Sequence, residues 1–161
     1  MAETRWLDAD EQRTWRSFLT ATRLLFDALD RELQHDAGMP HAYYEILVRL
    51  SEAPERRLRM SQLAGCTQSS RSRLSHAVAR LEQAGWVRRE SCATDKRGQL
   101  AVLTDEGFAA LAAAAPGHVE GVRKHLLDPL TAEQVSQLRA ISEAVVRHLE
   151  DDATAGDPKA A

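Results

Sequence analysis

Cysteine, aromatic residues and long apolar runs are scarce in this chain of 161 residues. Its two cysteines, Cys66 and Cys92, lie far apart and form no C-x-x-C pair, which favours a reducing cytoplasm over a secreted fold held by disulfides. No uninterrupted apolar run approaches the roughly 18–20 residues that span a bilayer. The segment MAETRWLDADEQRTW has neither the basic nor the apolar region of a secretory signal. We therefore expect a cytoplasmic protein with no membrane partner.

The sequence also lacks the motifs of common catalytic and cofactor sites. It contains no G-x-S-x-G, H-E-x-x-H, P-loop or G-x-G-x-x-G pattern. His118 and His125 fit one helical face, but two histidines do not make a zinc site. We therefore expect no enzyme activity, no metal site and no cofactor.

Positive charge is concentrated in one segment of an otherwise acidic chain. The formal net charge is −3 and the apolar content is 43%, enough for the core of a single domain over residues 1–161. Residues 56–97 contain ten basic and three acidic side chains, a net charge of +7, which leaves −10 for the remainder. A basic segment within an acidic chain is typical of nucleic-acid binding. A solvated charged surface is the alternative interpretation.

Two long amphipathic helices are predicted toward the ends of the chain. The first covers residues 8–37, with Asp8 as its N-cap, Glu11 in a capping box and Gly38 just past its end. Thr131 and Gln134 predict a capping box for the last helix, which extends to about residue 149. The apolar seam of this last helix consists of Val135, Leu138, Ile141, Val145 and Leu149. Residues 151–161, which follow the helix, are expected to be a disordered tail.

The first helix carries a comparable stripe of Trp15, Phe18, Leu19, Leu25, Phe26, Leu29 and Leu33. One domain of this size cannot cover both stripes, and leaving them in water would expose large apolar surfaces. We therefore expect a homodimer, with residues 8–37 and 104–150 as its dimerisation helices.

The central segment, residues 40–103, has the pattern of a winged helix-turn-helix. Pro40 and Pro54 bound one helix, and a short helix follows with Ser61 as its cap. SSRSRLSHAVARLEQAG is a further helix, followed by a strand from Trp86, a polar turn at 92–98 and the strand QLAVL. Thr104 caps the helix DEGFAALAAAAP. The expected fold is therefore mainly α, with a two-stranded wing.

The helix before this wing is predicted to read DNA. Leu74, Ala77, Val78, Leu81 and Gly85 are placed on the side that faces the core. Arginine on the other side can bind guanine bidentately, serine suits bases or phosphates, and the helix N-terminus favours phosphate. The candidate DNA-binding residues here are Ser69, Ser70, Arg71, Ser72, Arg73, His76 and Arg80, with Arg71 limited to the DNA backbone.

These residues resemble the MarR (multiple antibiotic resistance regulator) family of bacterial transcription factors. The resemblance is carried by RLRMSQLAGCTQSSRSRLSHAVARLEQAGWVRRE and by DKRGQLAVLT, which matches the family's D-x-R…L-T wing signature at Asp95, Arg97, Leu103 and Thr104. It implies a homodimer that binds a palindromic operator in double-stranded DNA, as a repressor. It also implies that Asp95 orients Arg97 toward the minor groove, with Lys96 at or near the tip of the wing.

The resemblance further implies a small aromatic or phenolic effector between the dimerisation helices and the DNA-binding lobe. The candidate residues are Trp15, Phe18, Leu19, His41, Tyr43 and Tyr44, for which core packing is the alternative. Some family members sense peroxides through a cysteine near the N-terminus. Here Cys66 is most easily a small buried residue, whereas Cys92 is a candidate for exposure. A redox-sensing regulator and a ligand-independent architectural DNA-binding protein remain alternatives.

Overall fold

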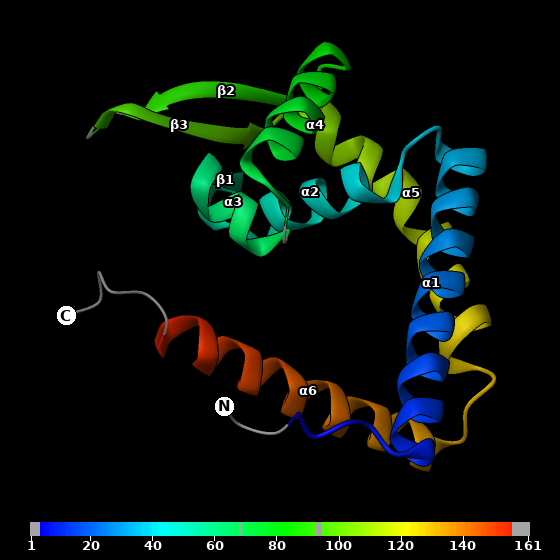
Figure 1. Ribbon diagram of the computed structural model, residues 1–161. Helices are drawn as coiled ribbons and strands as arrows, with labels where there is room; N and C mark the ends of the chain where they lie inside the picture. The colour runs from blue at the N-terminus through cyan, green and yellow to red at the C-terminus, as the bar shows by residue number, and fades with distance from the viewer. Residues whose placement is uncertain (1–3, 68, 93–94, 156–161) are drawn as a thin grey trace. The chain divides into compact units, whose positions relative to one another are not determined.

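The computed structural model describes residues 4–67, 69–92 and 95–155, with backbone only for 95–97 and 153–155 (Figure 1). The chain divides into two compact units, Met1–Gly121 and Val122–Ala161. Within the described residues, no helix combines the length and the apolar character needed to cross a membrane.

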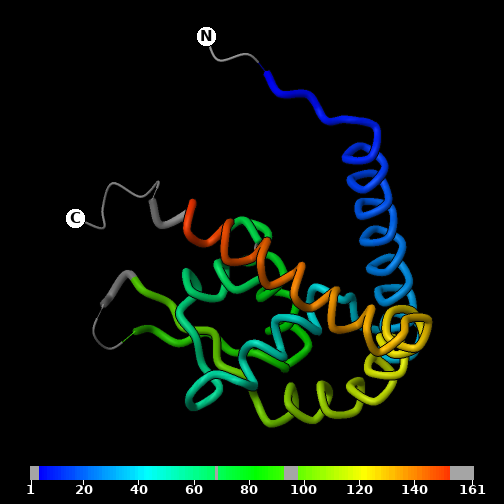
Figure 2. Tube along the Cα trace, turned by 90° about the horizontal axis from the view of Figure 1, so that it is seen from below, coloured from blue at the N-terminus to red at the C-terminus, as the bar shows by residue number. Residues whose placement is uncertain are grey.

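The first unit begins with a long straight helix, α1 (Ala9–Ala37). The Asp8 carboxylate accepts the backbone N–H groups of Asp10 and Glu11, and the Glu11 side chain accepts the N–H of Asp8, as the capping box predicts. Gly38 ends the helix in the left-handed conformation, with φ +62°. Only the C-terminal half of α1 contributes to the core, through Leu29 and Leu33. Its N-terminal half extends away from the β-sheet (Figure 2).

Four further helices build the core beside that end of α1. They are α2 (His41–Glu52), α3 (Met60–Cys66), α4 (Arg71–Gln83) and α5 (Asp105–Val122). Pro40 precedes α2 and Pro54 follows it, so both expected boundaries are confirmed. The largest of the fully buried side chains are Met39, Leu47, Leu50, Leu63, Leu74, Val78 and Leu81. These residues lie on α2, α3 and α4 or at the α1–α2 junction, so the helix-turn-helix itself forms the centre of the core.

A three-stranded antiparallel sheet completes this unit. Its strands are β1 (Arg57–Arg59), β2 (Val87–Cys92) and β3 (Asp95–Leu103), in the order β1-β3-β2. The hairpin β2–β3 is the predicted wing, and Val87 pairs with Leu103 at its base. The strand β1, which pairs Leu58 with Ala101, was not predicted from the sequence. Three residues are too few to show an alternating pattern, so only the pairing with β3 makes this segment a strand.

Some predicted boundaries are wrong. The helix α3 begins at Met60, one residue before the predicted cap Ser61, and Gln62 Oε1 accepts the backbone N–H of Arg59 at 3.2 Å. Gly85 does not face the core: it is exposed after the end of α4 and has a φ of +76°. The turn in the wing is shorter than 92–98, because β3 already begins at Asp95.

The helix α5 also runs further than predicted, since Pro116 does not end it and it continues to Val122. In the second unit, a π-helical turn, η2 (Arg123–Leu127), precedes α6 (Ala132–Ala155). The predicted capping box is confirmed: Gln134 donates its N–H to Thr131 Oγ1 at 3.2 Å, and Thr131 donates its N–H to Gln134 Oε1 at 2.9 Å.

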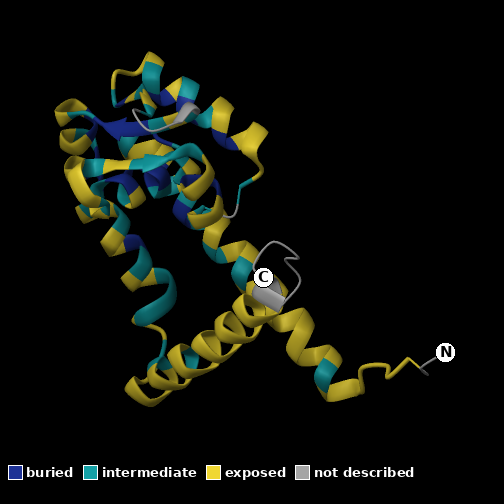
Figure 3. Cartoon of the chain, turned by 90° about the vertical axis from the view of Figure 1, so that its left-hand side faces the viewer, coloured by how far each residue is buried: buried dark blue, intermediate teal, exposed yellow. Residues whose placement is uncertain are grey.

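The helix α6 extends over the first five residues of the segment expected to be disordered, and the rest of that segment lies outside the described residues. Nearly every residue of α6 whose side chain the structure describes is exposed in the single chain (Figure 3).

Candidate nucleic-acid interface

The helix α4 has one buried and one exposed face, as predicted. Leu74, Val78 and Leu81 are buried. The opposite side is exposed and consists of Ser72, Arg73, His76, Arg80 and Gln83. Arg80 donates to Gln83 Oε1 at 3.2 Å within this face. Four nitrogen-bearing side chains and a small hydroxyl are therefore presented to solvent from one helix, as major-groove contact requires.

The turn between α3 and α4 is held by its own polar groups. Thr67 Oγ1 donates to the carbonyl of Leu63 at 2.9 Å, and Ser69 Oγ donates to the carbonyl of Thr67 at 3.3 Å. Ser70 is the N-cap of α4, because its hydroxyl accepts the backbone N–H of Arg73 at 3.3 Å. Ser69 is half-buried, whereas Ser70 and Arg71 are exposed. Both serines therefore orient the start of α4 through hydrogen bonds inside the protein.

The base of the wing is joined to the first turn of α5. Thr104 donates its hydroxyl to the carbonyl of Gly85 at 2.7 Å and its backbone N–H to the carbonyl of Trp86 at 3.1 Å. The same hydroxyl accepts the N–H of Gly107 at 3.0 Å, which confirms Thr104 as the predicted cap. Leu103 is buried in the core. The side chains of Asp95, Lys96 and Arg97 lie outside the described residues.

Arg89, which was not among the predicted site residues, connects β2 to α4. Its guanidinium Nη2 donates to the backbone carbonyl of Ser75 at 2.8 Å and lies 3.5 Å from Ser75 Oγ. Its Nε lies 3.4 Å from Glu82 Oε2, and its backbone N–H donates to Glu82 Oε1 at 3.0 Å. No sequence pattern separates Arg89 from the neighbouring Arg88, which instead pairs with Glu90 on its own strand.

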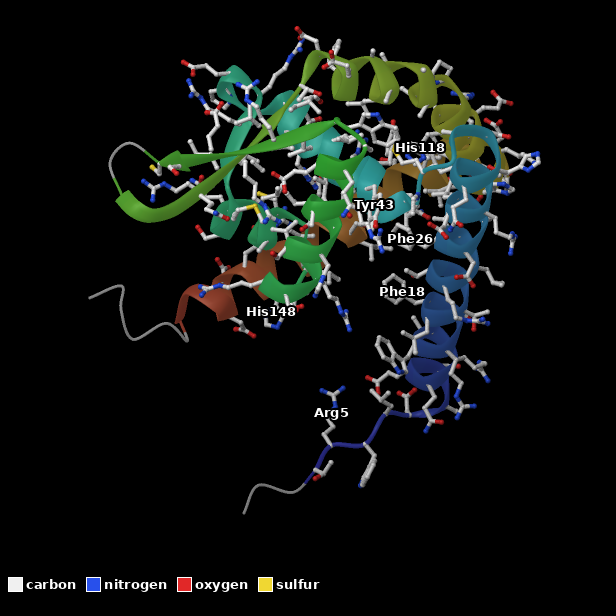
Figure 4. The ribbon with its side chains drawn as sticks, turned by 90° about the horizontal axis from the view of Figure 1, so that it is seen from above. Arg5, Phe18, Phe26, Tyr43, His118 and His148 are labelled. Atoms are coloured by element: carbon white, nitrogen blue, oxygen red, sulfur yellow. The ribbon has the colours of Figure 1, made fainter. Side chains whose placement is uncertain are left out.

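An open groove of about 510 Å³ lies among α1, α2, the end of α3 and α5. Of the six predicted ligand-binding residues, His41 and Tyr44 line it, and Tyr43 is half-buried beside the core. Trp15, Phe18 and Leu19 are exposed nearer the start of α1 and are not among the residues that line this groove. Phe18 and Phe26 project from the same side of α1 (Figure 4). The lining consists of Phe26, His41, Tyr44, Glu45, Val48, Arg49, Glu52, Cys66, Thr67 and His118.

Four rings meet inside this groove. His41 contacts Phe26 edge to face at a centroid distance of 5.5 Å and His118 at 5.5 Å, and His118 contacts Tyr44 at 4.4 Å. Burial and the neighbouring His41 both lower the pKa of His118 below its ordinary value. Burial raises the pKa of the Tyr44 hydroxyl. The groove is therefore an aromatic surface whose central histidine favours its neutral form.

The two cysteines differ from their predicted surroundings. Cys66 was expected to be buried, but it is exposed, because the C-terminal end of α3 faces the open groove. Cys92 is half-buried in β2. Cys66 is a free thiol. Among the residues that the structure describes, no cluster of three or more His, Cys, Asp or Glu side chains is placed to hold a metal ion.

Known proteins with similar sequences regulate transcription. The profile of the MarR family matches residues 37–98. The HTH-type transcriptional regulator PecS of Dickeya dadantii is 39% identical over 89 residues, which are 55% of this chain and 53% of PecS. The chain thus matches about half the length of that relative.

Solved structures extend the similarity to nearly the whole chain. Sco3205, a MarR family transcriptional regulator from Streptomyces coelicolor crystallised in complex with DNA, is 58% identical, with a TM-score of 0.87 over 91% of this chain and 92% of its own. AbsC, another MarR family regulator from Streptomyces coelicolor, is 44% identical, with a TM-score of 0.85 over 92% of this chain and 99% of its own. The resemblance and the winged helix fold inferred from the sequence are confirmed: this chain belongs to the MarR family of transcriptional regulators.

Proposed function

We propose that this protein is a homodimeric repressor that acts in the cytoplasm by binding a palindromic operator in double-stranded DNA. The observation that carries the proposal is the exposed face of α4, with Ser72, Arg73, His76 and Arg80 beside a buried apolar face. The crystal structure of Sco3205 with DNA, at 58% identity, supports the same use of this fold here. Its role is regulation rather than catalysis.

In this proposal the helix α4 and the wing contact different grooves of the DNA. The exposed face of α4 enters the major groove, where Arg73 reads a guanine edge and Arg80 approaches the backbone. The wing enters the neighbouring minor groove, where an arginine suits the narrow, electronegative form of A·T-rich DNA. The proposed DNA-binding residues are Ser69, Ser70, Arg71, Ser72, Arg73, His76, Arg80, Asp95, Lys96 and Arg97.

The homodimer is supported by apolar surface that the single chain leaves exposed. On α1 the exposed side chains include Trp15, Phe18 and Leu19. On α6 they are Ile141, Val145, Val146 and Leu149, at 50–63% exposure. A two-fold axis through these helices removes both stripes from water. It also presents two copies of α4 about one DNA turn apart, roughly 34–36 Å, which matches an inverted repeat.

We further propose that a small aromatic or phenolic molecule relieves repression. The aromatic groove lined by His41 and Tyr44 supports this step, and Trp15, Phe18, Leu19 and Tyr43 remain candidate contacts. A ligand that binds one arrangement of the helices better than another shifts the spacing of the two recognition helices. It would then dissociate the protein from its operator.

Selection of bound fragments from genomic DNA tests this function. An enriched inverted repeat is the expected result, and flat enrichment would instead indicate an architectural DNA-binding protein. On the selected operator, Arg73→Ala should cost about 1–3 kcal/mol and relax the preference at one base pair per half-site. Arg31→Ala, which removes an exposed arginine from α1, is the matched control. Equal binding by Arg73→Ala and the wild type would refute the assignment of α4.

A further inference from the structure

Arg89 links the wing to α4 at two points along the helix. Glu82 Oε1 accepts the backbone N–H of Arg89 at 3.0 Å, and Glu82 Oε2 forms an ion pair with the Arg89 Nε at 3.4 Å, without a hydrogen bond between these two atoms. The far end of the guanidinium reaches the backbone carbonyl of Ser75, at 2.8 Å. Ser75 and Glu82 lie two turns apart on the same side of α4, and each contacts different atoms of the one Arg89 residue. The start of β2 lies beside α4 (Figure 1).

The contacts of Arg89 with Glu82 and with Ser75 together restrain the angle between β2 and α4 as well as the distance between them. A single contact would let β2 pivot against α4, whereas contacts at both ends of the Arg89 side chain oppose that rotation. Both partners are half-buried: the Arg89 side chain is 24% exposed and the Glu82 side chain 31% exposed. The planar guanidinium fork can serve both partners at once, which the single ammonium group of a lysine cannot.

We infer that Arg89 is a positioning residue that fixes the angle between the wing and the recognition helix α4. This inference rests on the proposed function, because the angle matters only if α4 and the wing contact the same DNA. With the angle fixed, a major-groove contact by α4 places the wing in the adjacent minor groove without a further ordering cost. Arg89 therefore acts on the minor-groove contacts through the wing and not by touching the DNA.

Arg88 provides a natural comparison on the same strand. Its side chain donates to Glu90 Oε1 at 2.8 Å, and it is 59% exposed. The pair Arg88–Glu90 lies entirely on β2, so it cannot restrain β2 relative to α4. If positive charge on this strand were all that DNA binding needed, Arg88 and Arg89 would respond alike to substitution by lysine.

Methylation of the selected operator by dimethyl sulfate tests the inference, because the reagent reports guanine N7 in the major groove and adenine N3 in the minor groove. Arg89→Lys keeps the charge and removes the fork. We expect the protein concentration that half-protects adenine N3 in the flanks to rise about tenfold. The concentration that half-protects guanine N7 in the half-sites should change much less. Arg88→Lys should protect both positions like the wild type.

A second set of variants separates positioning from stability. Glu82→Gln removes the charged partner of Arg89 and should give the same selective loss, and the double variant should be no worse than either single one. A loss of both protections in equal proportion would overturn the inference, because general destabilisation lowers the active fraction without changing the ratio. Unchanged protection by Arg89→Lys would overturn it as well. A wild-type protein that protects no DNA would overturn the proposed function itself, and this inference with it.

Discussion

The first turn of α5 lies so close to the turn before β2 that Gly107 leaves no room for a side chain. A Cβ atom at this position would overlap the carbonyl oxygen of Trp86 and lie 2.8 Å from its carbonyl carbon and 2.9 Å from Leu103 Cδ1. Two of these three atoms belong to the backbone, so no rotamer change can relieve the overlap. For Gly107→Ala to fold, the start of α5 must move away from Trp86.

That movement breaks specific hydrogen bonds. Thr104 binds the carbonyl of Trp86 through its N–H and the carbonyl of Gly85 through its hydroxyl. Overpacking costs about 1–3 kcal/mol, and each hydrogen bond that is lost adds about 1 kcal/mol. The expected destabilisation of Gly107→Ala is therefore about 3–5 kcal/mol, a large share of the roughly 5–15 kcal/mol that stabilises a typical domain.

Thermal and urea unfolding monitored by circular dichroism measure this effect, with all variants at one protein concentration because a dimer's stability depends on it. The melting temperature of Gly107→Ala should fall by roughly 6–20 °C. Gly65→Ala is the matched control: Gly65 lies within α3, and its added Cβ meets nothing within 4 Å. It should gain up to about 1 kcal/mol from the higher helix propensity of alanine. A Gly107→Ala protein as stable as the wild type would refute the argument from close packing.

Two further outcomes are expected, one for pH and one for assembly. Because the pKa of His118 is lowered in the folded protein, the unfolded chain binds a proton at this histidine more readily than the folded chain does. The contribution of neutral His118 to folding stability is therefore complete above about pH 6.5, and it is lost as the pH falls through the lowered pKa. His118→Gln should therefore lose less stability than the wild type between pH 7.5 and 5.5 in urea titrations, and equal losses would contradict this cause. Ile141→Glu places a charge on the exposed seam of α6 and should yield monomers by sedimentation. Arg147→Glu, on the side of the helix opposite this seam, should remain dimeric. A dimeric Ile141→Glu would argue against the proposed interface.

The sequence by itself determined the features that depend on neighbours within a few residues. The capping boxes at Asp8 and Thr131 and the two faces of α4 all follow from spacings of three, four or seven residues, and the structure has them. The wing could also be predicted from the sequence, because β2 and β3 are adjacent in the chain and a polar turn separates them. The exposed face of the candidate site was therefore available from the sequence before any tertiary contact was known.

Only the tertiary structure decided which distant residues meet. The strand β1 exists because Leu58 pairs with Ala101, and Cys66 is exposed because the end of α3 borders a groove built also from α1, α2 and α5. The contact of Arg89 with Ser75 has no counterpart in composition or periodicity, since Arg88 beside it looks the same in the sequence. Such contacts depend on how helices and strands pack, and no local sequence pattern identifies the residues that the packing brings together.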